Sequence, residues 1–166
     1  MTTTPHTLSA HGELLHRANG TGPAFWGPGD HYTFLVTGEE SGGAYFAMEA
    51  LVPPGGGPPP HIHAREDETF YLLEGNVEFL LGEQTVVAGP GDFVNVPRGT
   101  MHRFRNTGTE TARLVLTFTP AGIERWFEET LERAPNEVRP EDVPDNIEEV
   151  ATRYVAAAPR YGIEFV

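Results

Sequence analysis

The chain has 166 residues, of which 39% are hydrophobic, and its formal net charge is −13 at pH 7. This length suits one domain with a full hydrophobic core, and the negative charge disfavours binding to nucleic acid or to anionic lipid surfaces. The sequence contains no Cys and no Lys, which excludes disulfides, thiolate metal ligands and a catalytic Schiff-base lysine.

The apolar runs of the chain are short and are interrupted by 15 Pro and 19 Gly. This punctuation favours an all-β architecture over a helical bundle. No run approaches the roughly 20 apolar residues that a membrane-spanning helix needs. The first residues lack the apolar centre of a signal peptide, so we expect a cytoplasmic protein.

Residues 1–31 are polar and rich in Gly and Pro, which predicts an N-terminal arm that is irregular or pairs with a sheet edge. Residues 32–120 then carry short apolar runs at the spacing of a β-sandwich or closed barrel. The predicted strands are Tyr32–Thr37, Ala44–Val52, Glu68–Leu73, Val77–Leu81, Thr85–Val87, Asp92–Val96, Thr100–Arg105 and Arg113–Phe118.

The pattern changes after Pro120, so residues 121–166 are expected to form a C-terminal helical extension. Ile123, Trp126, Phe127 and Leu131 share one face of a predicted helix within residues 121–134. A second helix is predicted within residues 145–157, and the last residues could add an edge strand. The apolar face of the first helix needs a partner, either the barrel or a second subunit. We expect a homodimer.

Candidate metal ligands lie in two separate segments. His61 and His63 are two residues apart, so a strand would point both to one side. Glu68 follows after a presumed bend, and His102 follows the turn that contains Pro97. Three imidazoles and one carboxylate suit a single divalent ion of Fe, Ni, Mn, Zn or Cu.

The same residues also allow other interpretations. An isolated His-X-His pair is more often an ordinary strand feature than a metal site, and an isolated acidic turn is more often solvated. The neighbouring carboxylates Glu66, Asp67 and Glu74 are alternative ligands. The four other histidines are assigned to solvent or to the N-terminal arm; they are His6, His11, His16 and His31.

The two segments resemble the two signature motifs of the cupin superfamily at every fixed position. The matching residues are Gly55, His61, His63, Glu68 and Gly75 in the first motif, and Gly91, Pro97, Gly99, His102 and Asn106 in the second. The resemblance implies a double-stranded β-helix, which is a jelly-roll barrel, over residues 32–120. It also implies that His61, His63, Glu68 and His102 bind the metal and that Asn106 is structural.

The layout of the chain is similar to that of single-domain bacterial cupins of the quercetin 2,3-dioxygenase-like kind. This likeness implies a metal-dependent oxygenase that acts on a small phenolic or enolic compound, with Glu68 as ligand and catalytic base. A non-redox cyclase or isomerase of polyketide-like substrates is one alternative, and a non-catalytic small-molecule-binding cupin is another. The side chains expected to line an aromatic substrate pocket, if they are not plain core, are Phe70, Leu72, Phe79, Phe93, Met101 and Phe104.

Overall fold

The computed structural model describes residues 14–138 and 142–166. Its strands are β1 (Ala24–Trp26), β2 (His31–Val36), β3 (Phe46–Val52), β4 (His61–His63), β5 (Asp67–Glu74), β6 (Val77–Leu81), β7 (Gln84–Ala88), β8 (Phe93–Val96), β9 (His102–Asn106), β10 (Ala112–Thr119), β11 (Glu132–Arg133) and β12 (Ile163–Phe165). The helices are α1 (Glu124–Thr130) and α2 (Ile147–Ala157), and a short 3-10 turn occupies Ala158–Tyr161.

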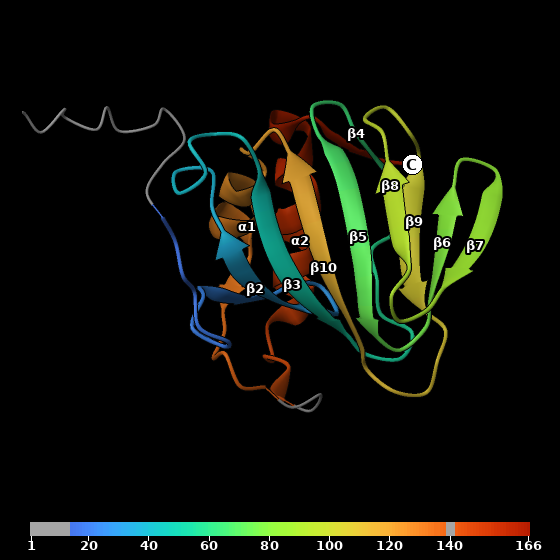
Figure 1. The fold of residues 1–166 in the computed structure, drawn as a ribbon, viewed down its shortest axis with the longest axis horizontal. Coiled ribbons are helices and arrows are strands. Elements are labelled where there is room, and N and C mark those ends of the chain that lie inside the picture. Colours follow the sequence, from blue (N-terminus) through green and yellow to red (C-terminus); the bar gives the residue numbers. More distant parts are fainter. Residues whose placement is uncertain (1–13, 139–141) are drawn as a thin grey trace, which may run out of the picture.

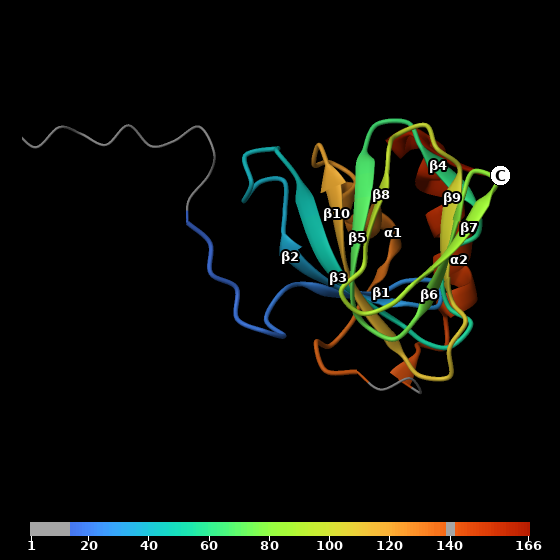
Figure 2. The same ribbon diagram turned by 45° about the vertical axis from the view of Figure 1, so that its right-hand side comes forward.

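The strands form two antiparallel sheets that face each other (Figure 2). One has the order β11-β1-β2-β3-β10-β5-β8, and the other has the order β12-β4-β9-β6-β7. The expected all-β jelly-roll barrel with C-terminal helices is therefore confirmed. Because strand side chains alternate between faces, every second residue of β5 and β10 is buried between the sheets.

Both helices lie behind β2, β3 and β10 in the view of Figure 1. The apolar face predicted for the first helix is buried, and the ring of Phe127 packs against Phe34, Phe46 and Phe118. The barrel of the same chain therefore covers this face. The expectation that its apolar area requires a second subunit loses its basis, and the homodimer stays a prediction.

The first helix is shorter than its apolar pattern suggested. It ends at Thr130, Leu131 is extended, and Arg133 pairs with Phe25 of β1. Sheet pairing overrides the helical pattern here. Residues 24–31, expected in the N-terminal arm, contain β1 and the start of β2, whereas residues 1–13 of that arm lie outside the described part. Among the described residues, no helix is long and apolar enough to span a membrane.

Candidate metal centre

The four candidate ligands converge between the two sheets. His61 and His63 point inward from β4, and His102, at the start of β9, lies opposite His61. Residues 64–66 carry the chain from one sheet to the other, so Glu68 on β5 faces the histidines from across the barrel. All four side chains are buried, and one donor atom from each lies within 4.8 Å of the others. This group could hold a metal ion.

Three short contacts define the centre of the cluster. Nε2 of His61 lies 3.1 Å from Nε2 of His63. Oε2 of Glu68 lies 3.2 Å from Nε2 of His63 and 2.9 Å from Nε2 of His102. Two donors bound to one ion at about 2.1 Å and at right angles would be about 3.0 Å apart. The observed separations therefore fit donors that share one ion.

Backbone carbonyl groups fix which nitrogen of each ring faces the cluster. Nδ1 of His61 lies 2.9 Å from the carbonyl oxygen of Pro59, and Nδ1 of His102 lies 2.9 Å from that of Thr100. A carbonyl oxygen only accepts hydrogen bonds, so these Nδ1 atoms carry protons. In the neutral form that binds a metal, each of these rings would therefore direct the lone pair of Nε2 into the cluster.

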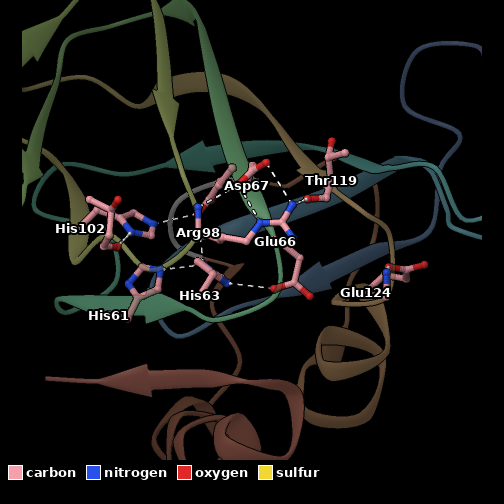
Figure 3. A network of polar contacts seen from close by, with 11 residues as sticks. His61, His63, Glu66, Asp67, Arg98, His102, Thr119 and Glu124 are labelled. Atoms are coloured by element: carbon pink, nitrogen blue, oxygen red, sulfur yellow. Dashed lines mark hydrogen bonds and ion pairs between the residues drawn. The ribbon is translucent and has the colours of Figure 1, made fainter.

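A fifth side chain, Glu66, completes the surroundings of His63. Its Oε2 atom lies 3.7 Å from Nδ1 of His63, on the side of the ring that faces away from the cluster (Figure 3). Both atoms are buried and have no hydrogen-bond partner among the described residues. A carboxylate in this position orients a ligand histidine and strengthens its basicity. Sequence reasoning treated Glu66 only as an alternative ligand.

The cluster strongly shifts the ionisation of its members. Burial lowers the pKa of His61 to about 3, and the neighbouring His102 and His63 add to this shift. Burial alone would also lower the pKa of His63, but Glu66 and Glu68 outweigh it and raise that pKa to about 9. Burial would raise the pKa of Glu68, yet hydrogen bonds from His102 and His63 hold it well below its usual range. Glu68 is therefore ionised at neutral pH and suited to bind a cation.

The other acidic candidates have different partners. Asp67 accepts hydrogen bonds from the side chain of Arg98, at 3.1 Å, and from its backbone N–H (Figure 3). These bonds lower the pKa of the exposed Asp67 to about 2 and tie β5 to the turn before β9. Glu74 lies at the far end of β5, 3.5 Å from Arg113. Neither residue belongs to the cluster.

The remaining motif residues and histidines also have defined surroundings. Asn106 donates hydrogen bonds to the carbonyl oxygens of Val52 and Glu110 and accepts one from the backbone of Gly108. His31 is buried and contacts the carbonyl oxygen of Pro135, whereas His16 is exposed. His6 and His11 lie outside the described residues.

The cavity beside the cluster is small, about 20 Å³. Of the predicted pocket residues, only Phe104 lines it. Phe70, Leu72 and Phe79 are fully buried core residues. Met101 is half-buried, immediately precedes β9 and does not line the cavity. Phe93 was also expected to line the pocket, but its side chain is 63% exposed on the outer face of β8 and does not face the cavity.

The cavity has walls that sequence reasoning missed. They are aromatic side chains from distant parts of the chain, namely Tyr32, Phe118, Trp126, Phe127, Tyr154 and Phe165. Phe118 had a signal in the alternation of its strand. The other five come from the N-terminal strands and the C-terminal segment. The helical pattern placed Trp126 and Phe127 on an apolar face, but the surface against which that face packs is set by the tertiary fold.

Comparison with known proteins places this geometry in context. The Cupin domain family matches residues 48–118. The chain is 30% identical over 100 residues to a quercetin 2,3-dioxygenase of Bacillus subtilis, which covers 60% of this chain and 29% of that protein. It is 32% identical over 92 residues to polyketide synthase CurC of Streptomyces cyaneus, which covers 55% of this chain and 60% of that protein.

A solved structure shares the fold. The RmlC-like cupin from Shewanella frigidimarina superposes with a TM-score of 0.59 at 19% identity, over 68% of this chain and 96% of that one. The chain spans 29% of the length of its quercetin 2,3-dioxygenase relatives from Bacillus subtilis and Aspergillus japonicus. Residues 48–118 thus match the Cupin domain family, and the two-sheet barrel shares its fold with this solved cupin.

Proposed function

We propose that the protein is a metal-dependent oxygenase that acts on a small phenolic or enolic compound, with His61, His63, Glu68 and His102 as metal ligands. The observation that carries the proposal is the convergence of three Nε2 atoms and one carboxylate oxygen in a buried, mostly aromatic cavity. The likeness to quercetin 2,3-dioxygenases supports the choice of an oxygenase, although it covers only part of those proteins.

A divalent metal at this site would stabilise the ionised oxygen of a phenol or enol and supply redox chemistry toward O₂. The carbonyl groups of Pro59 and Thr100 hold His61 and His102 in the orientation that directs Nε2 inward. Glu68 supplies the negative charge and is proposed to accept the proton that leaves the substrate hydroxyl. The surrounding aromatic rings exclude water, which strengthens these electrostatic interactions.

A second candidate is a non-redox cyclase or isomerase that acts on a polyketide-like substrate. The similarity to polyketide synthase CurC, which extends over 60% of that protein, favours it. The same four ligands would then provide Lewis-acid chemistry alone, and Glu68 would keep its role in proton transfer. The two candidates differ in whether turnover needs O₂.

The first experiment measures the metal content of protein purified without an affinity tag. We expect about one divalent ion per chain in the wild type and loss of that ion in a His61→Ala, His63→Ala double variant. The exposed His16 provides a matched control, because His16→Ala removes an imidazole far from the cluster. Full metal occupancy in the double variant would contradict the proposed ligands.

The second experiment screens O₂ uptake on phenols and enols with metal-loaded protein. Glu68→Gln keeps the size and an oxygen donor but removes the charge, and loss of a general base costs about 10²–10⁴-fold in rate. Glu83→Gln, in an exposed turn, is the control. Unchanged turnover of metal-loaded Glu68→Gln protein would refute the proton-accepting role. Conversion at the same rate without O₂ would refute the oxygenase and favour the cyclase or isomerase.

A further inference from the structure

A second cavity of about 180 Å³ adjoins the metal centre. It shares Tyr32, Pro58, Tyr154 and Phe165 with the small cavity beside the cluster, so the same side chains form walls of both spaces. Val155 of α2, which is 47% exposed, lines the second cavity on the side of the solvent. The second cavity therefore lies next to the cavity that His61 and Glu68 line, with the four shared side chains between them.

One buried carboxyl group lines the second cavity. It belongs to Asp30, which is only 3% exposed. Its Oδ2 atom accepts a hydrogen bond of 3.0 Å from the hydroxyl of Tyr32. Oδ1 has no partner at normal hydrogen-bond geometry among the described residues, although the backbone amide of Gly57 lies near enough to the carboxyl group to affect its pKa. A buried carboxyl oxygen without a partner is costly, so its persistence calls for an explanation.

The surroundings of Asp30 favour a ligand that donates a hydrogen bond. Burial raises the pKa of Asp30 to about 7, against the lowering effects of the Tyr32 hydroxyl and the Gly57 amide. The ionised form, which can only accept hydrogen bonds, is therefore present at neutral pH and predominates above it. The other walls are mostly apolar rings and prolines, and such a cavity with few polar groups is typical of small-molecule sites.

We propose that this cavity is the substrate pocket, and that Asp30 accepts a hydrogen bond from a second hydroxyl group of a single-ring phenol. This inference rests on the proposed function, because the first hydroxyl group of the same ring would reach the histidine cluster between the side chains that line both cavities. The size supports one ring: the cavity is smaller than the roughly 300–1,000 Å³ of pockets for drug-sized ligands. Asp30 is then a specificity-determining residue that acts at the end of the substrate remote from the cluster.

The test compares two probes, resorcinol and its monomethyl ether, on protein as purified. The ether keeps the ring and one hydroxyl group but cannot donate at the second position. Binding is followed by fluorescence, since the ring of Trp126 stacks on Tyr154 at 3.9 Å between centroids. Because both probes present the same first hydroxyl to the cluster, the ratio of their affinities reports the second cavity and not the metal.

We expect wild-type protein to prefer resorcinol by about tenfold, the value of one hydrogen bond in a buried site. In Asp30→Asn the oxygen keeps the Tyr32 hydroxyl as donor and an NH₂ group replaces Oδ1, so the preference should vanish or reverse. Val155→Trp should block both probes, whereas Val87→Trp on β7, which is exposed and outside the cavity, should not. Thermal melting of each variant identifies loss of fold.

Equal affinity of the wild type for both probes would overturn the role of Asp30, and so would an unchanged preference in a folded Asp30→Asn variant. Unaltered binding to Val155→Trp, or no binding of either probe to the wild type, would overturn the pocket itself. None of these outcomes concerns metal content or O₂ uptake, so the proposed function can fail or stand separately.

Discussion

Metal affinity should fall steeply as the pH drops from about 8 to 6, since ligand histidines must lose their protons to bind. The decisive residue is His63, because Glu66 and Glu68 raise its pKa to about 9 against the opposing effect of burial. At neutral pH the metal-free site therefore holds a proton on His63, and the incoming metal must displace it.

The magnitude follows from the two shifted histidines. His61, with a pKa of about 3, is already neutral throughout this range and adds no proton competition. Displacing one proton from His63 lowers the apparent affinity nearly tenfold per pH unit well below about 9, or about 2.7 kcal/mol between pH 8 and pH 6. A site of three unshifted histidines would instead keep its affinity down to a pH of about 6.5.

The proton on His63 stabilises the metal-free fold, so the stability of that fold falls with rising pH while metal affinity increases. The pKa of His63 in the folded chain is about 9, above the value of about 6.5 in the unfolded chain. Its stabilising contribution is therefore complete below about pH 6.5 and is lost as the pH rises through 9. The gain in melting temperature on metal loading should consequently grow with pH.

The assay is competition for Zn²⁺ against a chelator of known affinity, together with calorimetry in two buffers of different ionisation enthalpy. We expect at least one proton to be released per ion bound at neutral pH. Metal affinity that is flat between about pH 8 and 6, with no proton released, would refute the reasoning about His63.

Three further predictions concern single side chains. Above about pH 9, where His63 carries no proton, Glu66→Gln should weaken metal affinity about 10–100-fold by removing the carboxylate beside His63. Equal affinities of this variant and of the control Glu83→Gln in a chelator competition at that pH would contradict the prediction. Phe127→Ala should lower the free energy of unfolding in urea by about 3–5 kcal/mol because the ring is buried. The exposed control Phe93→Ala should change it by less than about 0.5 kcal/mol. Equal effects of the two variants would contradict the difference in burial. The exposed cross-strand pair Tyr71 and Phe93 is the candidate interface of the predicted homodimer. Light scattering should give the mass of two chains for the wild type and of one chain for Phe93→Asp. A monomeric wild type at micromolar concentration would contradict the homodimer.

Local spacing predicted only part of the cluster, and the family resemblance added His102 to it. The alternation of a strand places His61 and His63 on one face, and the bend before Glu68 is the crossing between the two sheets. Both features are short-range, so a pattern along the chain can predict them. The position of Glu66 was not predicted, because it depends on the path of that crossing in three dimensions.

The predicted pocket residues show how the alternation of side chains along a strand determines which of them face the interior. In β8 the buried residues are Val94 and Val96, and Phe93 shares its outer face with Asn95. The polar Asn95 was the available signal that Phe93 faces solvent. Met101 immediately precedes His102 and therefore has the opposite parity to an inward-pointing ligand. Aromatic character alone did not identify the side chains near the cluster.

The residues that match the Cupin domain family are not the ones that line most of the proposed pocket. The Cupin domain match covers residues 48–118, which include all four members of the cluster. Tyr32, Trp126, Tyr154 and Phe165, which line the cavity, lie outside that range, and so does Asp30. Moreover, β12 pairs with β4, so the C-terminal segment contacts the strand that carries His61 and His63. Resemblance to the family therefore bears on the cluster. The proposed pocket is lined largely by residues outside the matched range, and variants in those residues are the informative ones.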